Sequence, residues 1–272
     1  MKHASRIYLC IVFAVLYIPI LTLILFSFNS SNSTASFTGF SLMWYEELFK
    51  SPDTFIALRN SLILAVSSSV IATVIGTAAA EGIYKLKNKY IKTAISSVTN
   101  IPMMNPDIVT GMSMMLFFVL VAAIIGISYE NIGFTAMLIS HITFCLPYVI
   151  LSVLPRINEL GDSLSEAAMD LGCTPLQAFF KVKLPNIMPG VLSGMVLAFT
   201  MSLDDFVISY FVGSSNFQTL PLLIYSMTKK KVTPDMYALS TLIIVTVFVL
   251  LVLSNVKGGK KATNAGRRGK SK

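Results

Sequence analysis

The sequence predicts an all-α membrane protein with about six transmembrane helices. Of its 272 residues 54% are hydrophobic and only 12% are charged, about half the charge that a soluble domain carries. One core cannot bury so much apolar surface, so the remainder must face lipid. Apolar runs of about 20 residues also recur along the chain between short polar loops, and a helix of that length crosses the hydrocarbon core.

Six apolar runs are expected to span the membrane: residues 7–28, 60–80, 108–127, 134–154, 190–212 and 237–253. The first run follows Lys2 and Arg6 and is too long for a signal peptide, so we expect it to be retained. The segment 42–49 is amphipathic and rich in aromatic residues, which is typical of a helix along the outer membrane surface. The apolar segment 220–227 is expected to dip back into the membrane from the outside.

Proline, glycine and asparagine predict irregularities within these spans. Asn105 as N-cap and Pro106 at the first helical position predict that a new helix begins just before the third span. Pro147 is expected to break the fourth span. Gly190 and Gly194 have the GxxxG spacing that allows two helices to approach closely. We therefore expect the fifth span to pack against a neighbouring helix at its beginning.

The distribution of basic residues predicts the orientation of the chain. Most of the 21 lysines and arginines fall at the N-terminus, between Lys85 and Lys92, in the polar segment of about 155–189, and in the tail 257–272. Cytoplasmic loops are enriched in such residues, so we expect both termini in the cytoplasm. Residues 1–256 would form the transmembrane domain, followed by a basic, disordered cytoplasmic tail. The exception is the outer group 229–231, for which contact with a partner is the expectation.

The longest polar passage contains its own start and stop signals. Ser163 and Glu166 have the spacing of a capping box, so a helix is expected to begin there. Gly172 can adopt the left-handed conformation that ends a helix. The capping signals restart at Thr174, which is followed by a proline and, three residues on, by a glutamine. Two short helices are therefore expected, the second stopped by Pro185.

A family pattern runs through this passage and is carried by Glu166, Ala167, Ala168, Gly172, Leu184 and Pro185. The spacing resembles the cytoplasmic EAA loop of bacterial ABC importer permeases, with Val182 standing where isoleucine is usual. The resemblance implies a type I ABC importer permease fold, in which these residues form a coupling helix that fits a separate ATPase subunit. ATP and magnesium would then be bound by that ATPase, and this chain itself would need no cofactor.

Further phrases resemble the spermidine/putrescine type within this family, in particular the second of its two permease subunits. They lie at 26–31, 105–109, 140–148, 202–206 and 220–227. The resemblance implies import of polyamines across the bacterial inner membrane by alternating access. The implied partners are an ATPase dimer, a second homologous permease and an extracytoplasmic polyamine-binding protein. Nucleic acid is not among them.

Carboxylates in apolar surroundings are the candidate pathway residues. Asp204 and Asp205 lie about 21 Å along the fifth span, hence in the outer half of the membrane, where an ionised aspartate costs about 3 kcal/mol. Neighbours on a helix point about 100° apart, so one is expected to line the pathway and the other to pair with a neighbouring helix. Asp107 fits either a pathway or a helix start. Phe206 and Tyr148 offer aromatic faces to a cation.

An enzyme is not expected, because no HExxH, GxSxG or paired-cysteine motif is present. The three cysteines show no CxxC spacing, which argues against a disulfide framework or zinc. His141 and Cys145 could share a helix face, but without a nearby carboxylate buried packing is favoured over a metal site. Two alternatives to polyamine import stay open. One is an ABC importer permease for another small solute, and the other is a self-contained channel or ion-driven carrier.

Overall fold

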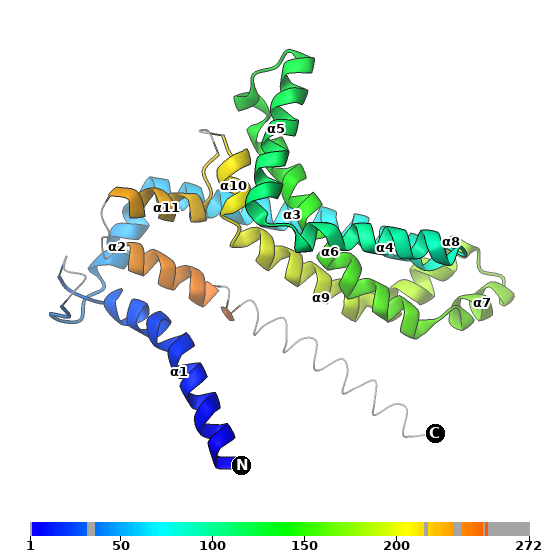
Figure 1. The fold of residues 1–272 in the computed structure, drawn as a ribbon, viewed down its shortest axis with the longest axis horizontal. Helices are drawn as coiled ribbons and strands as arrows, with labels where there is room; N and C mark the ends of the chain where they lie inside the picture. Colours follow the sequence, from blue (N-terminus) through cyan, green and yellow to red (C-terminus); the bar gives the residue numbers. More distant parts are fainter. Residues whose placement is uncertain (1, 32–35, 215–216, 231–234, 247, 250–272) are drawn as a thin grey trace. The chain divides into compact units, whose positions relative to one another are not determined.

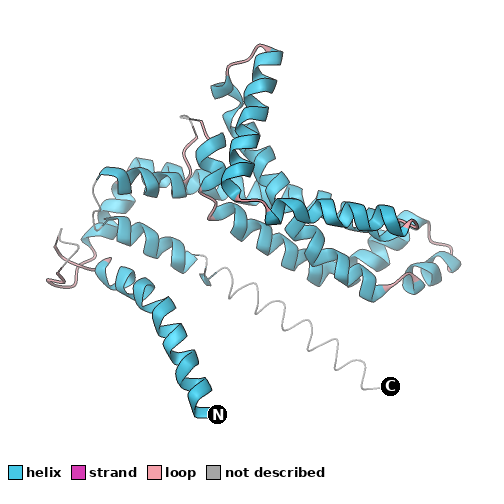
Figure 2. Cartoon of the chain, in the orientation of Figure 1, coloured by secondary structure: helices cyan, strands magenta, loops and turns pink. Residues whose placement is uncertain are grey.

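A computed structural model describes residues 2–31, 36–214, 217–230, 235–246 and 248–249. Within this range the chain is almost entirely helical, with short turns between helices (Figures 1 and 2). The residues form two compact units. Within the described ranges, the first combines residues 2–58 with residues 220–249, and the second is Arg59–Thr219. The predicted basic tail 257–272 lies outside the described residues.

The helices follow one another as α1 Lys2–Phe26, α2 Met43–Lys50, α3 Pro52–Lys85, α4 Lys89–Met104, α5 Asp107–Ile125, α6 Tyr129–Leu160, α7 Ser163–Asp170, α8 Pro175–Ala178, a π-helical turn Phe179–Lys183, α9 Leu184–Leu203, α10 Val207–Val212 and α11 Leu220–Lys230. Among the described residues, five helices are long and apolar enough to cross a membrane: Arg6–Phe26, Pro52–Lys85, Asp107–Ile125, Tyr129–Leu160 and Pro175–Leu203. A shorter apolar helix, Asp235–Thr246, stands where the sixth span is predicted. The predicted end of that span lies beyond the described residues.

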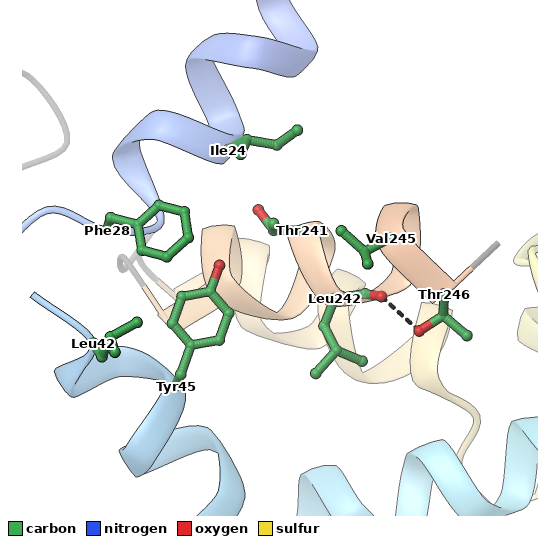
Figure 3. A pocket seen from close by; sticks show the side chains of 8 residues that line it. All are labelled: Ile24, Phe28, Leu42, Tyr45, Thr241, Leu242, Val245 and Thr246. Carbon is green, nitrogen blue, oxygen red and sulfur yellow. Dashed lines mark hydrogen bonds between the residues drawn. The ribbon is translucent and has the colours of Figure 1, made fainter. Parts of the chain in front are cut away.

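The first unit is held together by aromatic and apolar contacts. The amphipathic segment 42–49 does form a helix, α2, as predicted. Its Trp44 is buried and donates a hydrogen bond of 2.6 Å to the carbonyl of Asn29. A small apolar hollow of about 360 Å³, lined in part by Tyr45, lies between α1, α2 and the helix 235–246 (Figure 3). The apolar segment from Leu220 onwards is the helix α11, and Lys229 lies over the Tyr225 ring.

The second unit is organised by the packing of α6 along α9, as the GxxxG spacing predicts. A β-carbon added at Gly190 would lie 2.9 Å from the carbonyl oxygen of Ser152, and one at Gly194 would lie 3.2 Å from the α-carbon of Val149. Both distances are shorter than ordinary β-carbon contacts, so the two helices approach closely at the glycines. A β-carbon at Gly76 of α3 would lie 2.7 Å from the side chain of Val149, so α3 also approaches α6 closely. The helices can therefore bury a continuous apolar core between them.

Two prolines that the sequence predicts to break or end a helix do not do so. The prediction that Pro147 breaks the fourth span is wrong, because α6 continues through Pro147 and Pro155 to Leu160. The polar segment consequently begins at Gly161 rather than at 155. A proline inside a helix costs about 3 kcal/mol, whereas a helix that ends within apolar surroundings leaves up to four carbonyls and four amides unsatisfied. Continuation is the less costly solution.

Pro185 does not stop a helix either. The π-helical turn Phe179–Lys183 connects α8 to α9, and helical structure runs from Pro175 to Leu203. A proline ring conflicts with the carbonyl four residues before it. The wider π turn accommodates that conflict because its hydrogen bonds reach five residues instead of four.

The region before the third span also differs from the prediction. An additional helix, α4, begins at Lys89 after the N-cap Asn88, whose side chain accepts hydrogen bonds from the amides of Tyr90 and Ile91. Asn105 is the C-cap of α4 and donates to the hydroxyl of Thr110, while Pro106 is the N-cap of α5. The sequence obscures α4 because its first turn carries the lysines that are predicted as a loop.

The glycine contacts generate a stability prediction. Replacing Gly190 with alanine should lower the thermal unfolding midpoint, because the new methyl group meets the Ser152 carbonyl and overpacking costs about 1–3 kcal/mol. The matched control is Gly82→Ala, since nothing lies within 4 Å of a β-carbon at Gly82. The control should leave the midpoint unchanged or raise it. Equal midpoints for the two variants in detergent-purified protein would contradict close packing of α6 on α9.

Candidate functional site

The first short helix of the polar segment ends as predicted but begins differently. The N-cap of α7 is Asp162, so Ser163 is the first helical residue, and the predicted capping box does not form. At the other end Gly172 has a φ of 88°, the left-handed conformation that a glycine adopts without strain. Its amide donates to Met169 and the next amide, that of Cys173, donates to Ala168. These two bonds satisfy the last carbonyls of α7.

The second short helix begins with the capping box that the sequence predicts. The Thr174 hydroxyl accepts from the amide of Gln177 at 3.3 Å, and the Gln177 side chain accepts from the amide of Thr174 at 3.2 Å. Because only four residues separate the end of α7 from the start of α8, the two helices are joined by a tight turn. The segment therefore has a fixed local shape.

The predicted coupling residues are unequally exposed. Glu166, Ala167, Gly172 and Pro185 are exposed, Leu184 is half-buried and Ala168 is buried. Exposed apolar side chains surround them: Leu164, Met169, Leu171, Leu176 and Phe180. Leu171 alone leaves 88% of its surface uncovered. A cluster of large apolar residues on a polar segment is typical of a protein-binding surface.

The predicted pathway aspartates lie in a break between two helices. The fifth span was expected to be one helix, but α9 ends at Leu203 and α10 begins at Val207. Asp205 accepts hydrogen bonds from the amides of Ile208 at 3.2 Å and Ser209 at 2.8 Å, and its side chain is only 6% exposed. Asp204 is exposed. The two carboxylates therefore have different environments, because the break and not a helical rotation separates them.

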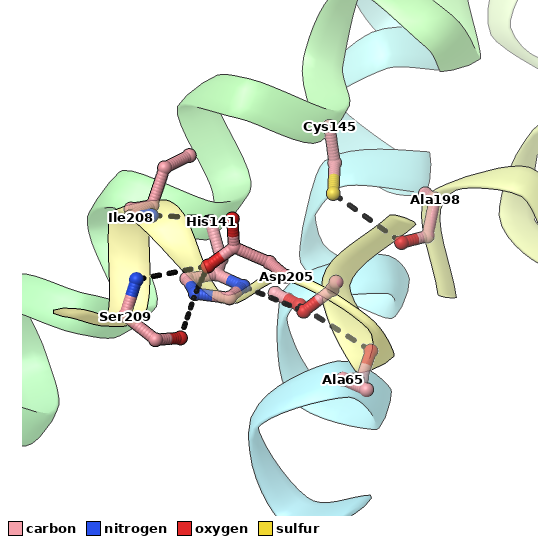
Figure 4. Close-up of polar contacts among 9 residues, drawn as sticks. Ala65, His141, Cys145, Ala198, Asp205, Ile208 and Ser209 are labelled. Atoms are coloured by element: carbon pink, nitrogen blue, oxygen red, sulfur yellow. Dashed lines mark hydrogen bonds and ion pairs between the residues drawn. The ribbon is translucent and has the colours of Figure 1, made fainter. Parts of the chain in front are cut away.

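A buried polar network fixes the break to the surrounding helices (Figure 4). The Nδ1 atom of His141, on α6, lies 2.8 Å from the hydroxyl of Ser202, and that hydroxyl lies 2.9 Å from the one of Ser68 on α3. The Nε2 atom lies 3.3 Å from the Ser209 hydroxyl and 3.5 Å from Asp205. A neutral imidazole protonated at Nε2 satisfies both sides, since it accepts from Ser202 and donates toward α10.

The other predicted pathway residues belong to elements that meet near this break. Helix α10 packs against both α5 and α6. Asp107 is the exposed first residue of α5, and one turn later Gly111 touches α10. Tyr148 is a half-buried residue of α6, and its ring lies 5.7 Å from that of Phe144. The Phe206 ring lies 5.5 Å from that of Tyr210. Residues far apart in sequence thus come together here.

The end of α9 is electrostatically suited to a cation. Carbonyls at the C-terminus of a helix carry about half a negative charge, and Asp204, the C-cap of α9, adds a full one. Broken helices in membrane proteins use such C-terminal ends to bind cations. No group of three His, Cys, Asp or Glu residues in the described ranges could hold a metal ion. His141 and Cys145 make separate contacts, since Cys145 donates to the carbonyl of Ala198.

The sequence did not identify the residues that support Asp205. Ser68, Ser202 and Ser209 are ordinary small polar residues in apolar helices, where packing alone explains their presence. A buried histidine in a membrane helix was the available signal, because ionisable residues there are costly and usually have a partner. That partner is 64 positions along the chain, so only the fold reveals it.

Comparison with known proteins gives concordant matches. Residues 72–256 match the family described as "Binding-protein-dependent transport system inner membrane component". The spermidine/putrescine transport system permease protein PotC of Haemophilus influenzae is 39% identical over 249 residues, 92% of this chain and 94% of that protein. The putrescine transport system permease protein PotI of Escherichia coli is 40% identical over 232 residues, 85% and 82% of the two chains. A bacterial ABC transporter that imports alginate superposes with a TM-score of 0.78 over 95% of both chains at 17% identity, so it shares the fold.

The two aspartates are expected to respond differently to substitution. Asp205→Ala removes a helix cap, which costs about 1 kcal/mol, and deprives buried His141 of a partner, which costs about 1–3 kcal/mol more. The thermal unfolding midpoint should fall by several degrees. Asp204→Ala is the control and should change stability by less than about 0.5 kcal/mol, because its side chain is exposed. Equal destabilisation would contradict the distinction between the two carboxylates.

Proposed function

The chain belongs to the family of binding-protein-dependent transport system inner membrane components, and on that premise we propose that it imports polyamines. It would be one permease subunit of an ATP-driven ABC importer that works by alternating access. Two independent arguments support a polyamine as the substrate. The relatives that are about 40% identical are named spermidine/putrescine and putrescine permeases. The helix break independently favours a cationic substrate over an anionic one.

The observation that carries the cargo assignment is the exposed carboxylate of Asp204 at the C-terminus of α9. A polyamine carries several ammonium groups, and each must exchange water for protein contacts on the way through. Charged hydrogen bonds to a carboxylate and to terminal carbonyls replace that water. Aromatic faces such as Phe206 and Tyr148 add cation–π contacts. An anion would instead require helix N-termini and basic side chains.

Asp205 has a positioning role in this proposal. Its carboxylate is occupied by two amides of α10 and faces His141, so it is not available to a passing substrate. By holding α10 in place it keeps α9 from continuing and thereby exposes Asp204. Asp107 and Tyr148 would contribute the opposite wall of the path, from α5 and α6.

The energy for transport would come from a separate ATPase dimer that holds ATP and magnesium. The exposed apolar surface around Glu166, Ala167 and Leu171 supports docking of such a partner, because water is an unfavourable neighbour for it. The complex would further contain a second, homologous permease and an extracytoplasmic polyamine-binding protein. Both termini of this chain would lie in the cytoplasm, together with α7 and α8.

Uptake by the reconstituted complex tests the cargo. Vesicles containing this chain and its partner subunits should accumulate radiolabelled spermidine or putrescine when ATP is supplied. Asp204→Asn should lower uptake about tenfold or more, because a charged hydrogen bond contributes about 1.5–3 kcal/mol. Asp204→Glu keeps the charge and should retain more activity. The control Glu159→Gln, on an exposed pair with Arg156, should transport normally.

Either of two results would overturn this assignment. Unimpaired polyamine uptake by Asp204→Asn would remove Asp204 from the path. ATP hydrolysis without uptake of any polyamine would retain the importer architecture and reject the cargo.

Charge reversal on the coupling helix tests the ATPase contact. Glu166→Arg should reduce both uptake and the transport-linked ATPase activity at least about tenfold, because the exposed carboxylate would face the partner. The amount of chain in the membrane should stay constant, as measured by immunoblot. Ser163→Ala on the same helix is the control, since Ser163 is exposed and is the first helical residue, not the N-cap. Normal uptake by Glu166→Arg would exclude α7 from the coupling contact.

A further inference from the structure

One buried lysine lies next to the N-terminus of the coupling helix α7. Lys183 is the last residue of the π-helical turn and only 2% of its surface is exposed. Lysine is almost never buried to this degree unless its charge is paired. A neighbouring ion pair gives the contrast, because Arg156 and Glu159 are 2.9 Å apart with both side chains more than half exposed.

The ammonium group of Lys183 contacts two other elements of the second unit. It lies 3.0 and 2.9 Å from the two carboxylate oxygens of Glu81 on α3. It also lies 3.7 Å from the carboxylate of Asp162, the N-cap of α7. The ring of Tyr84, one turn after Glu81, has its centroid 4.4 Å away. Lys183 directly precedes α9 in the chain. Its ammonium group therefore connects α9 with α3 and with the N-cap of α7.

The surrounding charges are balanced. Glu81 also forms an ion pair with Lys85, one turn later on α3, with 3.1 Å between the Lys85 ammonium and the Glu81 carboxylate. Two lysines therefore face two carboxylates, and the group of four carries no net charge. Glu81 is the central member because its side chain is nearly buried, whereas Lys85 and Asp162 are mostly exposed. Removing Lys183 would leave a buried carboxylate without its buried partner.

The π turn explains how Lys183 reaches this position. An inserted residue rotates all following side chains by about 100° relative to an uninterrupted α-helix. The wide turn is therefore compatible with a buried Lys183 on a segment where Phe180 and Lys181 are exposed.

We propose that Glu81 and Lys183 are positioning residues that join the coupling helix α7 to α3 and α9. This inference rests on the proposed function, because it assigns the route by which displacement of α7 by an ATPase reaches the spanning helices. Separating the two buried charges would leave each unpaired in apolar surroundings, which is costly. The pair therefore restricts how far α3 and the start of α9 can move apart. Because Lys183 also lies against Asp162, the N-cap of α7, a displacement of α7 would be passed through this pair to α3 and α9.

A distance measurement tests the link without reference to cargo. Cysteines for spin labels replace Gly82, where a β-carbon has open space, and the exposed Asp170 at the end of α7. Cys10 and Cys173 are replaced by serine, while Cys145 is buried and stays. In the full chain in lipid nanodiscs, Lys183→Met should at least double the width of the distance distribution. Glu159→Gln should leave it unchanged. An unchanged width in Lys183→Met overturns the proposal.

The uptake assay separates positioning from simple stability. The ratio of polyamine imported to ATP hydrolysed should fall at least about fivefold in Glu81→Gln and in Lys183→Met. The double variant Glu81→Gln/Lys183→Met has no unpaired buried charge, so it should recover thermal stability. Its transport ratio should remain low, because the link is still absent. Recovery of both stability and ratio would show that the pair only stabilises the fold and would overturn the proposal.

These two experiments also distinguish this inference from the proposed function. A wild-type complex that hydrolyses ATP but imports no polyamine rejects the cargo, and the width of the distance distribution then decides the link. A wild-type complex with normal import whose variants keep a narrow distribution rejects the link and leaves the function intact.

Discussion

The carboxylate of Asp205 satisfies two backbone amides at the start of α10, and the irregular part of the second unit depends on that contact. In apolar surroundings an unpaired amide costs several kcal/mol, so a helix can be interrupted there only if a side chain takes over its hydrogen bonds. Asp205 does so for α10, and His141 and Ser202 extend the same network to α6 and α3. The interruption in turn leaves Asp204 exposed at the end of α9.

Helix α3 makes buried polar contacts at two positions along its axis. Ser68 joins the network around the helix break, and Glu81 joins Lys183 beneath the coupling helix. Thirteen residues separate them, or about 20 Å along the helix axis. The same rigid element therefore contacts both functional regions. Between these two levels, small residues such as Gly76 allow α3 to lie close to α6. The proposed link through Glu81 and Lys183 would use this close packing to carry a displacement along α3.

Helical continuity is the second general constraint. Four prolines lie inside or at the start of long helices of the second unit without ending them: Pro147, Pro155, Pro185 and Pro189. Each removes one hydrogen bond, which is a smaller loss than the set of unsatisfied groups at a helix end within a bundle. The π turn before α9 shows the alternative to a stop, because it widens the helix locally and lets helical structure continue into α9.

The sequence by itself determined the features that depend on local chemistry or on composition. Apolar length predicted most of the spanning helices, the GxxxG spacing predicted a close contact at the start of the fifth span without its partner, and Thr174 and Gly172 marked helix ends whose hydrogen bonds are made within a few residues. The spacing from Glu166 to Pro185 indicated the family.

Only the tertiary structure decided the features that depend on partners far apart in the chain. Whether a proline ends a helix depends on what surrounds it, and which aspartate is exposed depends on the contact between Asp205 and His141. Likewise Lys183 and Glu81 are 102 positions apart. No local pattern specifies such a pair, because its stability comes from excluding water when distant helices pack.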